Sequence, residues 1–325
     1  MAKLTKKQKV AASKIEKNKP LKHYTKYVFQ GIATGKDEVF LISEQTCKDY
    51  KLEKEILFPI LKGKDIRKYS MDWSTNFIIY PYDKTTNKVI SENILKENYP
   101  NTFVYLSEKR YLLKGRGYFD KSNKLWYELW CERSISKFLE TKIVNAEISP
   151  ENRFQLDKSG ILGNTKIFST VLKDEWAEYN LALLAILNSK LLNYYHKKIA
   201  SPKAGGFFDY KTQFIQKYPI KFPENKVCIE TLAAILMILN NNNLSIQIED
   251  FIPNTHISEA FEEVIDALVF ELYFPEEFAE KGIEIEKYAQ DIFKSIEGLK
   301  EEEQIKAIQV AYQTLREKEN PLRNQ

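Results

Sequence analysis

The stretch LFPILKGKDIRKYS (57–70), with NFIIYPY (76–82) a few residues later, decides the fold class of the chain. Its apolar half passes into a polar, basic loop that opens at Gly63. The second segment predicts a short strand over 77–80, which ends at Pro81 because proline cannot continue a central ladder. The stretch therefore predicts sheet structure interrupted by a basic loop.

Predicted strands and helices alternate on both sides of this stretch. On its N-terminal side, YVFQGIATGKDEVFLIS (27–43) has strand formers around turn residues at 34–37 and predicts a β-hairpin. On its C-terminal side, helical periodicity runs over 90–116, where Pro100 is expected to start a new helix, and again over 176–199. Three more strands are predicted at 142–148, 152–157 and 166–172. The mixture predicts an α+β fold built on a mixed sheet.

After Pro223 the predicted secondary structure changes from mixed strands and helices to helices alone. Four helices are predicted from there on, at 227–242, 256–273, 284–297 and 300–318. We therefore place a domain boundary near residue 225. Residues 1–225 are predicted to form a basic α+β domain, and residues 226–325 an acidic, all-helical region for packing or subunit contact.

The charge divides at the same place. The formal net charge of the 325 residues is only +4, but residues 1–225 hold 40 Lys and Arg against 25 Asp and Glu, a net charge of +15. Residues 226–325 hold 9 against 20, a net charge of −11. The basic part suits a polyanion, which the acidic part would repel. A hydrophobic content of 43% excludes the disordered class.

The sequence carries no targeting signal that we identify. No apolar run is long enough to span a bilayer, and no apolar segment follows the N-terminal lysines as it would in a signal peptide. Cys47, Cys131 and Cys228 lie far apart, which is not the pattern of a disulfide framework or a zinc site. We expect a cytoplasmic protein without membrane contact.

The sequence shows none of the common catalytic motifs. A phosphate-binding Gly-rich loop, a dinucleotide fingerprint, a Gly-x-Ser-x-Gly elbow and the Asn/Asp-Pro-Pro-Tyr/Phe tetrapeptide of adenine methyltransferases are absent. The histidines have no metal-ligand spacing, and His196, among tyrosines and lysines, is interpreted as a surface or phosphate-facing residue. We predict no catalytic residue, no metal site and no covalent chemistry by this chain alone.

Three basic, glycine-bearing segments stand out instead, at 62–69, 114–118 and 201–211. Glycine lets the backbone approach a phosphate, Lys and Arg neutralise it, and Arg can also bind guanine. One such segment alone is best interpreted as a surface loop, but three in a basic domain favour nucleic acid. Asp65 either accepts from cytosine or orders its own loop, and the second role is favoured. The predicted DNA-binding residues are Lys62, Gly63, Lys64, Arg67, Lys68, Lys114, Arg116, Lys203, Gly205, Gly206 and Tyr210.

The same residues carry a family resemblance. The stretch over 57–82 resembles the TaqI-like C-terminal specificity domain, the target-recognition part of type IIG restriction–modification enzymes and related adenine-specific DNA methyltransferases. Matching segments stand in the expected order: GIATGKDEVFLI (31–42), WYELW (126–130), KIVNAEIS (142–149), LALLAILNSKLLNYYHKK (181–198), AGGFFDYKTQFIQKYPI (204–220) and FEEVIDALVFELYF (261–274). The similarity spans roughly residues 20–275.

The resemblance implies sequence-specific recognition of duplex DNA, with residues 1–225 as the target-recognition domain. A methyltransferase domain would flip an adenine out of the DNA that this domain holds. That domain and any nuclease domain have no counterpart in these residues. S-adenosylmethionine and Mg²⁺ are therefore expected only in the other part, and the expected partners are double-stranded DNA and a methyltransferase or nuclease domain or subunit. Whether the chain is a fragment of such an enzyme or a separate specificity subunit stays open.

Two other classes of function remain as alternatives. The first is a protein-interaction module whose basic face meets an acidic protein, and the second is a nuclease with a divergent site. Binding without a phosphate-like salt dependence would favour the first, and metal-dependent cleavage by the purified chain would favour the second. RNA recognition is a weaker option, because the family resemblance concerns duplex DNA.

Overall fold

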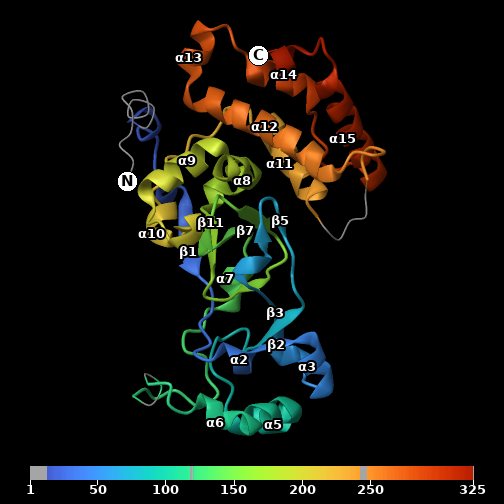
Figure 1. Ribbon diagram of the computed structural model, residues 1–325. Helices are drawn as coiled ribbons and strands as arrows, with labels where there is room; N and C mark the ends of the chain where they lie inside the picture. The colour runs from blue at the N-terminus through green and yellow to red at the C-terminus, as the bar shows by residue number, and fades with distance from the viewer. Residues whose placement is uncertain (1–12, 118, 120, 242–246, 325) are drawn as a thin grey trace.

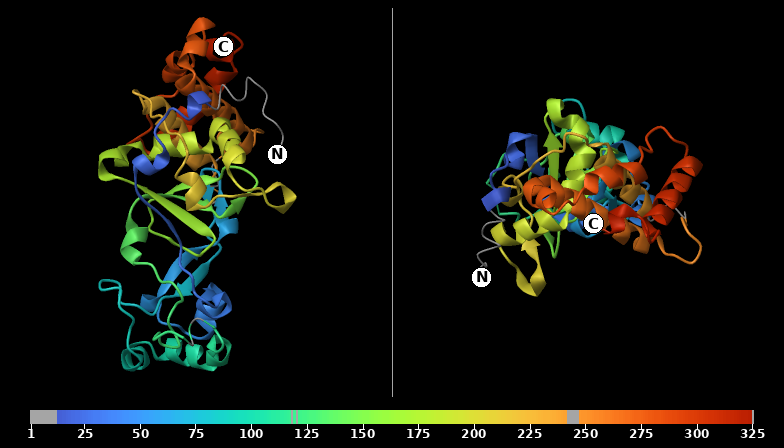
Figure 2. Two further views of the ribbon diagram at one scale, coloured as in Figure 1. Left: turned by 90° about the vertical axis from the view of Figure 1, so that its left-hand side faces the viewer. Right: turned by 90° about the horizontal axis from the view of Figure 1, so that it is seen from above.

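Residues 13–117, 119, 121–241 and 247–324 are described by the computed structural model, and their elements are arranged along one long axis (Figure 1). A four-stranded sheet lies near the middle. The helices that follow residue 225 lie at one end, and a second sheet with the helices of residues 92–113 lies at the other (Figure 2).

The central sheet contains the three strands predicted after residue 140. Its order is β1 (Thr25–Gln30), β11 (Ile167–Leu172), β7 (Lys142–Ala146) and β9 (Phe154–Asp157), and all neighbours are antiparallel. Every residue of β7, β9 and β11 is buried, so both faces of these strands are covered. The predicted strands at 142–148, 152–157 and 166–172 are confirmed.

The second sheet is mixed. Its order is β10 (Leu162–Gly163), β3 (Leu57–Leu61), β6 (Asn76–Ile79) and β2 (Leu41–Ser43), with β10 parallel to β3 and the other pairs antiparallel. Two short ribbons complete the strands: β4 (Ile66–Arg67) with β5 (Ser70–Met71), and β8 (Ile148–Ser149) with β12 (Phe208–Asp209). The strand predicted at 77–80 is confirmed as β6, and the α+β class is confirmed.

The hairpin predicted over 27–43 is wrong. β1 pairs with β11 and β2 pairs with β6, so the two strands belong to different sheets. The chain leaves the central sheet at Gly31, where a Cβ atom would lie 2.1 Å from the carbonyl oxygen of Gly163. The predicted turn residues lead instead into the short helix α2 (Asp37–Phe40). Strand formers in the sequence mark the strands but do not identify their partners.

The helices fall into three groups along the chain. The first group is α3 (Glu44–Asp49), α4 (Glu92–Asn98), α5 (Pro100–Glu108), α6 (Arg110–Leu113) and α7 (Ile135–Leu139). The second is α8 (Asn180–Asn188), α9 (Lys190–Ile199) and α10 (Thr212–Ile215). The third is α11 (Val227–Leu239), α12 (Asn254–Tyr273), α13 (Pro275–Glu280), α14 (Ile285–Ile292) and α15 (Glu301–Arg316). Short 3₁₀ helices are η1 (Leu21–His23), η2 (Lys54–Ile56), η3 (Gly63–Asp65), η4 (Asp174–Tyr179), η5 (Ala204–Gly206) and η6 (Pro321–Asn324).

The predicted helices are found with differences at their ends. α5 begins at Pro100, as predicted. The helix predicted over 176–199 is divided at Ser189, whose hydroxyl oxygen accepts from the amide of Leu192 at 3.3 Å and so caps α9. The four helices predicted after Pro223 correspond to α11, α12, α14 and α15.

Two large hydrophobic cores support this arrangement, with a smaller cluster that includes Leu61 of the second sheet and Val144 of the central sheet. One lies around the second sheet and includes Ile60 and Tyr105. The other joins the central sheet to the helical region, since Phe154 of β9, Leu184 of α8 and Leu236 of α11 belong to the same cluster of buried side chains. The domain boundary near residue 225 stays a prediction, but the hydrophobic core continues across that position.

His196 is a core residue and not the surface residue that the sequence suggested. Its ring is fully buried in α9, stacks on Tyr210 with the ring centroids 3.7 Å apart, and shares a 2.7 Å hydrogen bond through Nδ1 with the hydroxyl of Tyr218. Burial, with a smaller contribution from neighbouring Lys197, lowers the pKa of His196 from 6.5 to about 3. Of its neighbours in the sequence, Lys197 is exposed, while His196 and Tyr195 face inward.

This burial predicts a pH dependence of stability. Below pH 6.5 the unfolded chain binds a proton at His196, whereas the folded chain binds it only near pH 3. The free energy of unfolding is therefore highest above pH 6.5 and decreases as the pH falls. The expected contribution is about 1.4 kcal/mol per pH unit well below pH 6.5. Urea unfolding in steps between about pH 6.5 and 5 should show this slope in the unaltered chain and in His23→Gln, an exposed control. His196→Phe should remove it, and an equal slope in His196→Phe would contradict the assignment.

Candidate nucleic-acid interface

The first basic segment is a closely ordered loop. Asp65 is 3% exposed, and its carboxylate accepts from the amide of Lys62 at 2.7 Å and from the hydroxyl of Ser74 at 3.1 Å. The ammonium of Lys62 donates to Oδ1 of Asn76 at 2.8 Å. Asp65 therefore orders its own loop, the role favoured from the sequence.

Gly63 brings this loop against the turn before β11. A Cβ atom at this position would lie 3.2 Å from the Cβ of Lys166, so glycine permits the close approach. Lys64 and Arg67 are exposed on the same loop. The guanidinium of Arg67 donates to the carbonyl oxygens of Lys64 and, at 3.1 Å, Ile66. These two cations thus face solvent on a loop whose Gly63 lies against Lys166.

Lys68, which was also predicted to bind DNA, pairs with the helical region. The ammonium of Lys68 pairs with the carboxylate of Glu262 on α12, and both side chains are about three-quarters buried, with 27% and 25% exposure. Lys68 therefore connects the loop to the helical region.

The third basic segment forms an exposed hairpin over 201–207. The amide of Lys203 donates to the carbonyl oxygen of Phe207 at 2.7 Å, which closes the hairpin. Gly205 and Gly206 have φ values of +73° and +79°, which favour glycine, and a Cβ atom at Gly206 would have no neighbour within 4 Å. Phe207 is 40% exposed. The hairpin therefore ends in small residues and one exposed ring.

Tyr210 anchors the base of this hairpin. It is 1% exposed, its hydroxyl donates to Oδ1 of Asn152 at 2.9 Å, and its ring stacks on His196. Asn145 of β7 donates its side-chain amide to the carbonyl oxygen of Tyr210 at 3.1 Å. In the structure Tyr210 supports the hairpin from below, and its contact with DNA stays a prediction.

A chain of charged contacts joins the hairpin to the first loop. Lys203 pairs with Asp209 at 3.0 Å, and Lys211 lies 3.8 Å from Asp209 and 3.4 Å from Glu147. Glu147 in turn pairs with Lys166 at 2.8 Å, and Lys166 adjoins the first loop. The two carboxylates are buried, so they lie under the lysines. We call the solvent-accessible cations Lys64, Arg67, Lys166, Lys203 and Lys211 the central basic surface.

The second basic segment lies apart from this surface. It follows α6, at the end of the molecule opposite the helical region (Figure 1). The guanidinium of Arg116 donates to the carbonyl oxygens of Leu113 at 3.0 Å, Trp126 at 2.7 Å and Glu128 at 3.2 Å, so it clamps its own loop. Lys114 is exposed beside it. The structure therefore brings together two of the three predicted segments.

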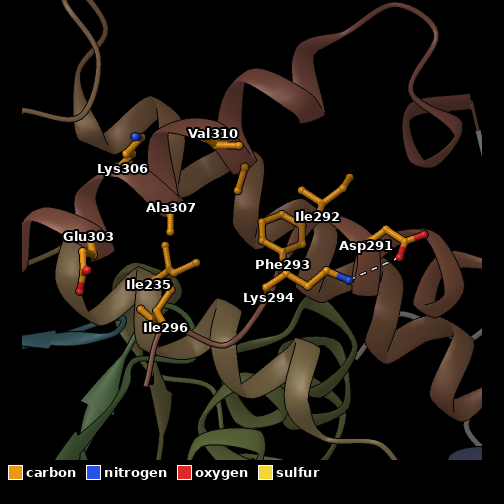
Figure 3. Close-up of a pocket in the computed structure, with 11 residues that line it drawn as sticks. Ile235, Asp291, Ile292, Phe293, Lys294, Ile296, Glu303, Lys306, Ala307 and Val310 are labelled. Carbon is orange, nitrogen blue, oxygen red and sulfur yellow. Dashed lines mark hydrogen bonds and ion pairs between the residues drawn. The ribbon is translucent and has the colours of Figure 1, made fainter. Parts of the chain in front are cut away.

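Three cavities lie in or beside the helical region. One, of about 400 Å³, opens between α11, α14 and α15, where Ile235, Phe293 and Val310 form apolar walls and the charges of Asp291 and Lys294 lie 3.5 Å apart (Figure 3). Two more, of about 640 and 780 Å³, are lined by residues between 221 and 323. None of these three cavities contains a residue of the central basic surface, which is an open surface suited to a large ligand.

In the parts of the chain that the structure describes, no group of three or more His, Cys, Asp or Glu side chains is placed to hold a metal ion. No helix among these same residues is both long and apolar enough to cross a membrane.

Sequence reasoning missed four members of this arrangement. The predicted site residues did not include Lys166, Lys211, Glu147 or Asp209, although Glu147 is the carboxylate that connects Lys166 and Lys211. A signal was present in KIVNAEIS, where a single charged residue follows an apolar strand. Glu147 is 9% exposed, and a carboxylate so buried requires a cationic partner. That requirement points to the nearby lysines.

A family model matches the part of the chain that contains the central basic surface. The model of the family described as TaqI-like C-terminal specificity domain matches residues 58–220, which is half of the chain. This range includes the first loop, the strands β7, β9 and β11 of the central sheet, and the hairpin.

Several curated proteins are similar in sequence. Type II methyltransferase M.BanIII of Aneurinibacillus aneurinilyticus is 28% identical over 233 residues, which cover 69% of this chain and 40% of that protein. Type II methyltransferase M.XhoI of Xanthomonas vasicola is 20% identical and covers 60% of this chain and 34% of that protein. The putative type II restriction enzyme and methyltransferase RM.MjaORFECS2P of Methanocaldococcus jannaschii is 25% identical, with 82% and 24% coverage. The chain thus spans 40% or less of these relatives.

A solved structure shares the fold. The type IIL restriction–modification enzyme MmeI, determined in complex with DNA, superposes with a TM-score of 0.56 and 10% sequence identity. The match covers 91% of this chain and 36% of that chain, so it includes most of the helical region as well as the sheets.

Proposed function

The chain belongs to the TaqI-like C-terminal specificity domain family, and on this premise we propose that it recognises a specific sequence in duplex DNA. It acts as the specificity part of a type II restriction–modification system. It positions a methyltransferase or nuclease part that lies outside these residues, and it carries out no covalent chemistry itself. S-adenosylmethionine and Mg²⁺ belong to that other part.

The central basic surface is the observation that carries this proposal. Two loops that are far apart in the sequence meet there, with five solvent-accessible cations, three of which pair with the buried carboxylates Glu147 and Asp209. The carboxylates fix the lysine side chains and leave a positive surplus. Fixed cations on an open surface suit a phosphate backbone, which positions a protein without reading sequence.

Base recognition requires elements that enter a groove. The hairpin over 201–207 projects from a buried base, and its tip has small residues that allow close approach. Phe207 supplies an exposed apolar ring, and Arg67 an exposed guanidinium on the neighbouring loop. We assign sequence reading to these two elements and phosphate contact to the lysines around them.

The proposal predicts salt-dependent binding of duplex DNA. In a fluorescence-anisotropy titration, the logarithm of the affinity should fall linearly with the logarithm of salt concentration between about 50 and 200 mM, with a slope of up to about −4.5 if each of the five cations meets a phosphate. Single-stranded DNA and duplex RNA of the same length serve as controls.

Three other outcomes would contradict the proposal. Equal affinity for polyglutamate and DNA would favour a protein-interaction module. Cleavage of the duplex in the presence of Mg²⁺, abolished by one carboxylate substitution, would favour a nuclease. Binding of single strands or RNA as tight as binding of duplex DNA would exclude duplex recognition.

A further inference from the structure

Helix α12 of the acidic helical region contacts the first loop and the start of α9, the helix that leads to the hairpin. Its Glu262 pairs with Lys68 of the first loop. One turn later, its Asp266 accepts from the amide of Lys190 at 2.6 Å and pairs with the ammonium of the same residue at 3.1 Å. Lys190 begins α9, which leads directly into the hairpin over 201–207.

The contact with the first loop is well ordered on the loop side. Tyr69, next to Lys68, is 1% exposed and belongs to the core that contains α12. Its amide donates to the carbonyl oxygen of Phe154 at 3.1 Å. Tyr69 has φ of +58°, a value that non-glycine residues seldom adopt and that the surrounding packing must hold in place. The turn between β4 and β5 is therefore fixed to the core at a strained residue.

The ion pair beside this turn is partly removed from water. Burial raises the pKa of Glu262, and the neighbouring Lys68 opposes that rise. A carboxylate in this position needs its cation, because an unpaired charge of this burial is costly. Lys68 is thus neutralised within the chain and is less suited to a phosphate than exposed Lys64 and Arg67.

We propose that α12 is a positioning element, which sets the first loop and the hairpin relative to one another through Glu262 and Asp266. The acidic helical region, assigned from sequence to packing or subunit contact, then has a role in DNA reading without touching DNA. Glu262 and Asp266 are positioning residues. This inference rests on the proposed function, since the surface that α12 aligns is the one assigned to DNA.

The test compares Glu262→Gln with Glu263→Gln, its exposed neighbour on the same helix. The ratio of affinities for a preferred and a scrambled duplex should fall by about 2–150-fold in Glu262→Gln, the range of coupling between contacting residues. The affinity for scrambled duplex should not fall, because no phosphate contact is lost. Amide hydrogen exchange over 66–71 should become faster without DNA. Glu263→Gln should match the unaltered chain in all readouts.

A charge-exchanged variant separates this role from a general loss of stability. Lys68→Glu combined with Glu262→Lys should restore the affinity ratio and the exchange protection that either single substitution lowers. Unchanged exchange and an unchanged ratio in Glu262→Gln would overturn the inference while leaving the proposed function intact. An unaltered chain without sequence preference would overturn the proposed function, and with it the link between α12 and DNA reading, even if exchange responds.

Discussion

Asp157→Ala is expected to lower the free energy of unfolding by about 3–5 kcal/mol, the usual cost of leaving a buried charge without its partner. Asp157 of β9 and Lys142 of β7 stand opposite each other in the central sheet, with exposures of 0% and 1%. The Lys142 ammonium donates to Asp157 and to the carbonyl oxygen of Phe138, and the other Asp157 oxygen accepts from the amide of Ser159 at 2.7 Å. Each carboxylate oxygen thus has a donor, and burial lowers the pKa of Lys142.

Two controls make this prediction specific, with urea unfolding near pH 7 as the measurement. Lys142→Met combined with Asp157→Leu removes both charges and should cost far less than Asp157→Ala, because no buried charge is left unpaired. Glu284→Ala breaks an exposed pair with Lys287 and should cost less than about 1 kcal/mol. A loss below about 1 kcal/mol in Asp157→Ala would contradict the account of the central sheet.

Substitution of Lys64, Lys166 and Lys203 by glutamine is expected to weaken duplex binding about 10–100-fold near 0.1 M salt and to reduce the salt slope by about 3. These lysines come from the first loop, the turn before β11 and the hairpin, so the variant tests whether the whole surface acts together. Glutamine retains a hydrogen-bond donor toward Glu147 and Asp209 but removes the charge that a phosphate requires.

The matched control removes three charges elsewhere. Lys281, Lys287 and Lys294 are exposed in the helical region, and their substitution by glutamine should leave the salt slope within experimental error. Circular dichroism of both triple variants verifies that the fold is retained. Equal losses of affinity in the two variants would show that binding follows overall charge and not the central basic surface.

The fold class was predictable because its signals are local. The β-branched residues of β7 and β11 and the helical stripe of α12 are visible in the sequence as strands and a helix. Strand pairing was not predictable in the same way. β1 pairs with β11 from a distant part of the chain, so the neighbouring strand formers near Val39 suggested a hairpin that does not exist.

The candidate site was predictable as a set of segments but not as a surface. Composition identified Lys64 and Lys203, and both residues are exposed in the structure. It did not distinguish them from Arg116, which clamps its own loop, or from Lys68, which pairs with Glu262. Such differences depend on contacts between distant segments, and a single sequence does not state them.

Selection of bound duplexes from a randomised pool tests the central claim most directly. The purified chain, or the assembly in which it occurs, is incubated with a pool of random duplexes near 0.15 M salt, and the bound fraction is sequenced over successive rounds. The account predicts enrichment of one short motif, and loss of that enrichment when Arg67 and Phe207 are replaced by alanine. Bound DNA with the same sequence composition as the starting pool would contradict it.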